Sequence, residues 1–197
     1  SIGRNAGSKS YMWVHTTSEL DQDHPIIVFR FELTRKTDHL RVFYGDAGFT
    51  GTCTSDCYCS YDILEKEYPD IRGSRCLMHA RRNFYYAAML VKAKEKPREE
   101  LNELPEFKAL ILIDAINDAD QPLKEVSPEE RQQIRETVVL EKADAFFDHL
   151  KTLDPDDPAY TETFRDAVKY ALNHEEKLRR FLDDPMIPID NGFCERA

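Results

Sequence analysis

Along the first third of this chain, short apolar runs and polar turn segments follow one another in a way that predicts strands. Short runs of β-branched and aromatic residues are bounded by turn segments such as SELDQDHP, a pattern typical of half-buried strands. We expect strands at residues 11–17, 26–34, 51–55 and 71–78. Two short helical patterns lie between them, one in 37–48 and one that ends before Pro69.

From residue 79 onwards the apolar residues recur at the spacing of helices. Helical segments are predicted at 79–96, at 105–119, from Ser127 onwards and at 159–184. The segment SPEE begins the third of them with a capping serine, a proline in the first turn and Glu130 three residues after the cap. After the proline-broken linker PMIPID, Asp190 is predicted to cap a last helix.

The order of these elements matches most of a ribonuclease-H-like fold. That α/β (α+β) fold has three antiparallel strands, a helix, a strand, a helix, a strand and a last helix around one mixed sheet. Here the first strand is absent, and an all-helical block is inserted before the last helix. We therefore expect a partial ribonuclease-H-like core at 1–96, a helical insertion at 97–186 and the start of the last core helix at 187–197.

Composition and charge narrow the class of protein. The chain has 197 residues, of which 41% are apolar and 32% charged, an ordinary soluble globular mixture. No apolar run approaches the roughly 20 residues that span a membrane. Five cysteines at uneven spacing indicate reduced thiols in a cytoplasmic protein. The chain lacks an initiator Met, and we expect it to be a fragment of a longer protein.

The net charge of −10 comes entirely from residues 83–197. An anionic partner would therefore have to meet local clusters of basic residues. One such cluster consists of Arg72, Arg75, Arg81 and Arg82. The ordinary interpretation of a cluster of this kind is a solvated face.

The segment TCTSDCYCSYD places three cysteines around one aspartate. A zinc site normally needs four ligands in two close pairs, and Cys57 and Cys59 lie too close together to chelate well. Cys76 and His79 have a workable spacing, but the chain has no second pair of that kind. Asp56 follows a predicted buried strand, where α/β proteins bind ligands, although a helix cap would use the same residue. Taken alone, neither interpretation decides the chemistry.

Four segments, taken in order, favour the aspartate. The chain contains TSDCYCSYDIL, then CLMHARRNF, then AVKYALNHEEKLRRFLDD, then IDNGFCERA. This ordered set resembles the bacterial DDE transposases of the insertion-sequence sixty-six group. The family's D-G-Y-x-x-Y matches Asp56, Tyr58 and Tyr61, with a cysteine in place of the glycine. Its C-x-x-H-A-R-R-x-F matches 76–84, and its I-D-N-N-x-x-E-R-A matches 189–197, with a glycine replacing the second Asn.

The resemblance implies an enzyme that cuts DNA at transposon ends and transfers the strands. It implies two Mg²⁺ or Mn²⁺ ions held by three carboxylates, of which Asp56 and Glu195 would be two. It also assigns Cys76 and His79 as residues that organise the site. The family's first catalytic Asp lies upstream of SKSYMWV, and residues 1–10 contain no Asp or Glu. We therefore expect the isolated chain to be inactive.

The resemblance also implies partners. We expect binding to DNA, both transposon ends and target, and self-association in the transposition complex, in the bacterial cytoplasm near the nucleoid and without a membrane. The basic residues expected to contact DNA are Arg81, Arg82, Arg196, Lys177, Arg179 and Arg180. Two alternatives stay open: a helical binding module with a Cys/His zinc site, and a ribonuclease-H-like nuclease without transfer activity.

Overall fold

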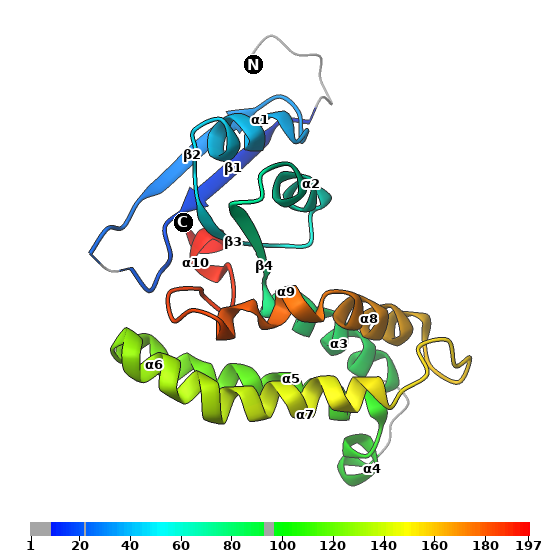
Figure 1. The fold of residues 1–197 in the computed structure, drawn as a ribbon. Helices are drawn as coiled ribbons and strands as arrows, with labels where there is room; N and C mark the ends of the chain where they lie inside the picture. The colour runs from blue at the N-terminus through cyan, green and yellow to red at the C-terminus, as the bar shows by residue number, and fades with distance from the viewer. Residues whose placement is uncertain (1–8, 22, 93–96) are drawn as a thin grey trace.

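Short strands form two separate sheets in the computed structural model, which describes residues 9–21, 23–92 and 97–197. The strands are β1 (Tyr11–Thr16), β2 (Ile27–Glu32), β3 (Gly51–Ser55) and β4 (Ile71–Arg75) (Figure 1). β1 and β2 are antiparallel, with Tyr11 opposite Glu32, whereas β3 and β4 are parallel, with Ser55 opposite Arg75. All four predicted strands and the mixture of α and β structure are confirmed.

One predicted strand boundary is wrong. We expected the fourth strand to continue through the apolar run CLM, but β4 ends at Arg75 and helix α3 begins at Leu77. The backbone N–H of Cys76 still donates to the carbonyl of Ser55, at 2.9 Å, but the N–H of Leu77 donates to Ile189, at 3.0 Å. Because the partner changes from a strand to a distant linker, the chain leaves the sheet at this point.

Helices fill most of the remaining described chain. The first half contains α1 (Asp38–Leu40), α2 (Cys59–Glu67) and α3 (Leu77–Lys92). The helical block contains α4 (Arg98–Asn102), α5 (Pro105–Asp120), α6 (Pro128–Ile134), α7 (Leu140–Lys151), α8 (Glu162–Asn173) and α9 (Glu175–Arg179). The last helix is α10 (Gly192–Arg196). A π-helical turn at Arg41–Gly45 extends α1, and another at Arg135–Val139 joins α6 to α7.

The two predicted helix caps have different outcomes. Ser127 caps α6 as expected, because its hydroxyl accepts a hydrogen bond from the backbone N–H of Glu130 at 3.2 Å. Asp190 does not cap α10, whose N-cap residue is Asn191. The carboxylate of Asp190 instead accepts a hydrogen bond from the N–H of Gly192 at 2.6 Å. Asp190 therefore stabilises the turn that leads into the helix.

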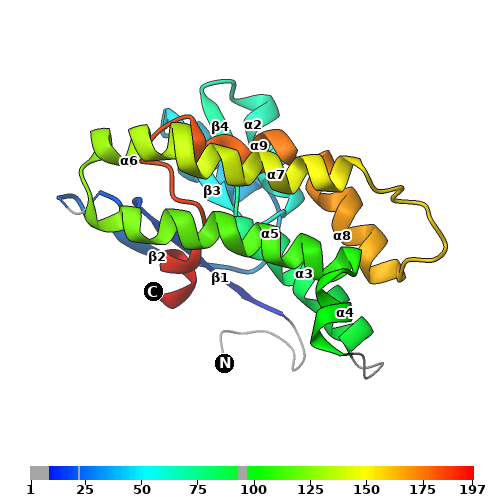
Figure 2. The same cartoon turned by 90° about the horizontal axis from the view of Figure 1, so that it is seen from below.

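Four helices build the main core of the molecule. α3, α5, α7 and α8 pack around buried aromatic side chains, and the ring of Phe84 meets those of Phe146 and Phe164 edge to face. Figure 2 shows α5 and α7 side by side. α3 therefore shares a core with the helical block, although its sequence lies before the predicted boundary at residue 96. The predicted domain division stays a prediction.

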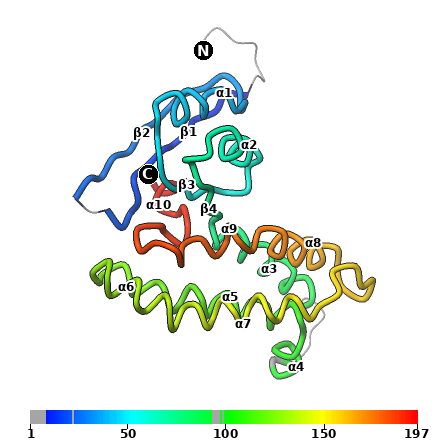
Figure 3. Tube along the Cα trace, viewed as in Figure 1, coloured from blue at the N-terminus to red at the C-terminus, as the bar shows by residue number. Residues whose placement is uncertain are grey.

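A smaller core lies under the first hairpin and contains Trp13, Leu40, Leu64 and Ile71. The chain returns to this region through the linker before α10, which Figure 3 traces in orange and red. α10 packs against β1, so the end of the chain lies beside strands from its first third. Within the described residues, no helix is long and apolar enough to cross a membrane.

Candidate active site

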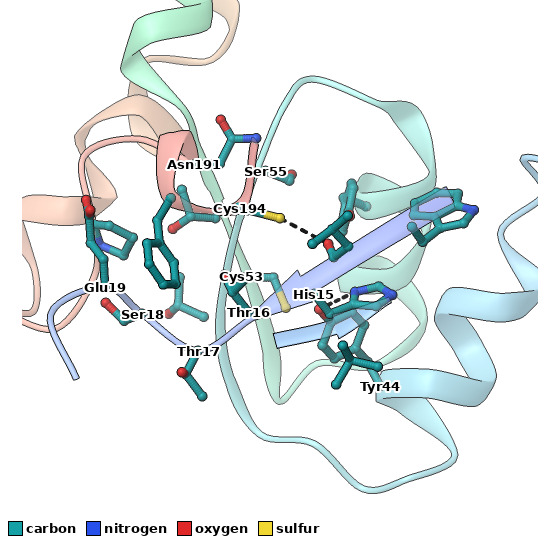
Figure 4. A pocket seen from close by; sticks show the side chains of 18 of the residues that line it. His15, Thr16, Thr17, Ser18, Glu19, Tyr44, Cys53, Ser55, Asn191 and Cys194 are labelled. Atoms are coloured by element: carbon teal, nitrogen blue, oxygen red, sulfur yellow. Dashed lines mark hydrogen bonds between the residues drawn. The ribbon is translucent and has the colours of Figure 1, made fainter. Parts of the chain in front are cut away.

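A cavity of about 1170 Å³ lies between the two sheets (Figure 4). Its walls come from β1, β3, the turn after β3, and the linker and helix at the end of the chain. Asp56 and Glu195, the two predicted catalytic carboxylates, both line this cavity. The fold therefore brings to one cavity two acidic residues that lie far apart in the sequence.

Asp56 lies in the turn after β3, with 37% of its side chain exposed. One carboxylate oxygen accepts a hydrogen bond from the backbone N–H of Tyr58 at 3.1 Å. The other oxygen is 3.7 Å from the guanidinium of Arg35, which also lies over the Tyr58 ring. The helix-cap interpretation of Asp56 fails, because Tyr58 is the N-cap residue of α2. Asp56 instead stabilises a local turn at the wall of the cavity.

Glu195 lies on α10 beside a histidine from α3. The Nε2 atom of His79 is 3.4 Å from a carboxylate oxygen of Glu195, whose side chain is 47% exposed. The other ring nitrogen of His79 is buried without a hydrogen-bond partner. The bond between Leu77 and Ile189 joins the start of α3 to the linker before α10, and this holds the two side chains together. The role of His79 in organising the site stays a prediction, but its contact with Glu195 gives that role a physical basis.

Burial keeps the thiols near the cavity protonated. It raises the pKa of Cys53 to about 12 and that of Cys76 to about 11, whereas zinc binds the thiolate form. The sulfur of Cys57 lies 3.1 Å from Nε2 of His174. In the part of the chain that the structure describes, no three His, Cys, Asp or Glu side chains are placed to share a metal ion. The zinc interpretation of the cysteines thus gains no support from their positions.

Two of the cations predicted to contact DNA are bound inside the molecule. Lys177 pairs with Asp62 at 2.8 Å and also with Glu65. Arg180 is only 6% exposed and donates to Glu65 at 2.8 Å and to the carbonyl of Gly73 at 2.9 Å. These bonds hold the end of the helical block against α2 and β4. The DNA contact of Lys177 and Arg180 stays a prediction, and their ion pairs with Asp62 and Glu65 argue against it.

The other cations predicted to contact DNA differ in their ion pairs and in their exposure to solvent. Arg179 forms a 2.7 Å ion pair with Asp144, and Arg81 pairs with Asp114 through two nitrogens. Arg82 is exposed on α3. The side chain of Arg196 is 67% exposed and lies 3.8 Å from Glu19 at its closest approach. Arg82 and Arg196 are therefore the most accessible of the set.

Two further side chains belong to the site although they were not assigned to it. Glu19 lines the cavity with 11% of its side chain exposed and lies 2.7 Å from Nζ of Lys124. Its segment was expected to be an ordinary surface turn, so the sequence carries no signal for it. Arg75 was expected on a solvated face, but it is 1% exposed. Its place inside a predicted buried strand was the signal that could have found it.

Comparison with known proteins identifies the family of this chain. The family model described as "Transposase IS66 family" matches residues 1–197. The chain belongs to the IS66 transposase family. The resemblance inferred from the ordered motifs is thereby confirmed. No solved structure matches the chain.

Curated relatives of this IS66 family member occur in Sinorhizobium fredii (strain NBRC 101917 / NGR234). The relative named Uncharacterized protein y4jD is 26% identical over 159 residues, which cover 77% of this chain and 28% of that protein. The relative named Uncharacterized protein y4qI is 26% identical over 210 residues, which cover 99% of this chain and 35% of that protein. The chain thus spans about a third of the length of the curated relatives that it matches.

Proposed function

We propose that this chain is part of the catalytic core of a DDE transposase, which cuts DNA at the ends of a mobile element and joins it to a target. The observation that carries the proposal is that Asp56 and Glu195 line one cavity. The reaction is an in-line attack on a phosphodiester, first by water and then by a DNA 3′-hydroxyl. Carboxylates from separate elements suit this reaction, because they can share divalent metal ions at one point.

The donor set at the cavity fits Mg²⁺ or Mn²⁺. Asp56 and Glu195 offer carboxylate oxygens, the ligands that hard divalent cations prefer, and the nearby Cys53 and Cys76 stay protonated because their pKa values are raised. Asp56 and Glu195 would hold the divalent metal, and the bound metal would supply activation of the nucleophile and stabilisation of charge on the leaving oxygen. His79 orients Glu195 from the side, as partners of metal ligands commonly do.

The cavity also supports a ribonuclease-H-like arrangement. β1 pairs only with β2 and β3 pairs only with β4 among the described strands, and both β1 and β3 line the cavity. One further strand between them would join the two sheets into a single mixed sheet. We place there an upstream segment that carries the third carboxylate. Without that segment, we expect the chain to neither cut nor join DNA.

DNA is the proposed partner, and its phosphates would meet the accessible guanidinium groups of Arg82 and Arg196. Arg81 is also assigned to DNA binding, although it forms an ion pair with Asp114. Self-association in the transposition complex and a place in the bacterial cytoplasm near the nucleoid complete the proposal. These follow from the transposase function.

Cleavage and joining assays on the complete transposase test this function. The substrate is DNA that carries the ends of the element, incubated with Mg²⁺ or Mn²⁺. Asp56→Asn and Glu195→Gln should each lower cleavage about a thousandfold, because bound metal supplies several kcal/mol of transition-state stabilisation. The matched control is Asp148→Asn, an exposed carboxylate on α7, which should leave cleavage unchanged.

Two outcomes would count against the proposal. Unchanged cleavage by either site variant would remove the assignment of that carboxylate. Cleaved ends without any joined product, under conditions that supply target DNA, would favour the simple nuclease over the transposase.

A further inference from the structure

We propose that Arg75 is a positioning residue that fixes the backbone of Asp56, an inference that rests on the function proposed above. Arg75 is the last residue of β4 and lies opposite Ser55, the residue before Asp56. Its side chain is 1% exposed. The guanidinium therefore lies directly under the turn that carries the proposed metal ligand.

The hydrogen bonds of Arg75 converge on that turn. One terminal nitrogen donates to the backbone carbonyl of Asp56 at 2.7 Å and to the hydroxyl of Ser55 at 3.2 Å. The Ser55 hydroxyl donates to the same carbonyl at 2.9 Å. On its other face the turn is closed by the bond from the N–H of Tyr58 to the Asp56 carboxylate. Both the backbone and the side chain of Asp56 are therefore restrained.

A buried guanidinium at this position needs an explanation other than strand packing. Removing a charge from water is costly unless it is paired and fully hydrogen-bonded, and an apolar residue would serve the fold of a buried strand end. Both terminal nitrogens of Arg75 are compensated, one by the carbonyl of Asp56 and the other by a direct pair with Asp62 on α2, whereas its Nε atom is buried without a partner. The compensation thus comes from the catalytic turn and from the helix that follows it.

The pair with Asp62 extends the restraint to the helical block. Lys177, the middle residue of α9, donates to the same carboxylate oxygen of Asp62, at 2.8 Å. Burial raises the pKa of Asp62, but the hydrogen bond from Lys177 and the charge of Arg75 outweigh it and leave that pKa below its usual value. The carboxylate is therefore held ionised between two cations. The helical block is in this way connected to the turn that carries Asp56.

Arg72 provides a matched comparison on the same strand. It lies three residues before Arg75, its side chain is 53% exposed, and it pairs with Asp183 on the surface at 2.9 Å. Replacement of either arginine by lysine removes a planar guanidinium from β4. Only Arg75 donates to the Asp56 carbonyl, and it reaches Asp56 and Ser55 through one terminal nitrogen and Asp62 through the other. The single ammonium nitrogen of a lysine cannot reproduce this planar two-nitrogen geometry.

The test is the Mn²⁺ midpoint of the complete transposase, measured both by metal binding, through the electron-paramagnetic-resonance signal of free Mn²⁺, and by DNA cleavage. Arg75→Lys should raise the Mn²⁺ concentration at half-maximal rate about tenfold, the usual effect of changing a group that orients a metal ligand, and saturating Mn²⁺ should restore much of the rate. Arg72→Lys should leave the midpoint unchanged. A merely structural role would lower the amount of active enzyme without moving the midpoint, and an unmoved midpoint in Arg75→Lys would overturn the inference.

Two further variants keep the result interpretable. If Arg75→Lys does not fold, Asp62→Asn removes one partner of Arg75 and should move the Mn²⁺ midpoint in the same direction; no movement would overturn the inference. Asp56→Asn tests the underlying function separately. Full cleavage by Asp56→Asn would remove the proposed site itself, whereas loss of cleavage there with an unmoved midpoint in the Arg75 variant would remove only the positioning role.

Discussion

The Nε2 atom of His79 lies 3.4 Å from a carboxylate oxygen of Glu195, although the helical block separates these residues in the sequence. His79 is fixed at the start of α3, inside the larger core. Glu195 lies on α10, which packs against β1. The histidine therefore gives the glutamate a fixed neighbour at the cavity.

Replacing His79 should weaken the site without unfolding the protein. His79→Ala should lower cleavage by the complete transposase about ten- to a hundredfold, as loss of a partner of a metal ligand does. His79→Gln should retain more activity, because its amide can replace Nε2 as a hydrogen-bond donor. His24→Ala is the control, since that side chain is 76% exposed. Equal activity of the Ala variant and the unchanged protein would remove His79 from the site.

The cysteines around Asp56 should be dispensable for metal binding. We expect a variant with Cys53, Cys57 and Cys59 all changed to Ala to keep its fold and its Mn²⁺ affinity, because the carboxylates bind the metal. Some stability should be lost, because Cys53 is partly buried against the smaller core and removing its sulfur leaves a small cavity. Elemental analysis that found one zinc per chain, lost in this variant, would contradict the expectation.

Arg180 should act on stability, since it is buried in an ion-pair network. Arg180→Ala leaves the carboxylate of Glu65 short of a partner and should lower the free energy of unfolding by about 3 kcal/mol. Lys169→Ala, which breaks a surface pair with Asp156, should cost less than about 1 kcal/mol. Urea unfolding measures both. A fall in DNA affinity with unchanged unfolding would instead support the original prediction that Arg180 contacts DNA.

The folded chain should become less stable as the pH is lowered, because of the titration of His15. Burial, then the charges of Arg30 and His39, lower the pKa of His15 from 6.5 to about 4. In the unfolded chain the imidazole binds a proton below about pH 6.5, whereas in the folded chain it binds one only below about pH 4. The folded state therefore loses stability as the pH is lowered from 6.5 to about 4. For this group the loss between pH 7 and pH 5 is about 2 kcal/mol.

The variant His15→Asn isolates that contribution. Asn can still bond to the hydroxyl of Tyr44, which lies 2.9 Å from the imidazole, but it does not titrate. Urea unfolding at the two pH values should show a smaller loss for the variant than for the unchanged chain. An identical loss in both would mean that His15 does not titrate in this way.

The first two strands could be predicted because their runs of β-branched and aromatic residues lie on either side of a clear turn segment. The start of α3 could not, because the run CLM suits a strand and a buried helix equally well. Its state is decided by the bond from Leu77 to Ile189, a residue more than half the chain away. A local pattern carries no information about such a partner.

Some residues of the candidate site could likewise be predicted from the sequence, and others could not. Asp56 and Glu195 could be assigned because ordered motifs mark them, and both line the cavity. The ion pairs of Lys177 and Arg180 could not be predicted, because a basic residue in a helical sequence looks the same on a solvated face and in an internal ion pair. Only the tertiary partners of these residues separate the two cases.

Iron-directed cleavage of the protein tests the central claim most directly. Fe²⁺ that occupies the Mg²⁺ site generates hydroxyl radicals with ascorbate and peroxide, and these cut the backbone next to the metal ligands. In the complete transposase we predict cuts at the turn around Asp56 and on the helix that carries Glu195, suppressed by excess Mg²⁺ and absent from Asp56→Asn. Cuts confined to other segments, or cuts at these positions that persist in Asp56→Asn, would contradict the assignment of the site.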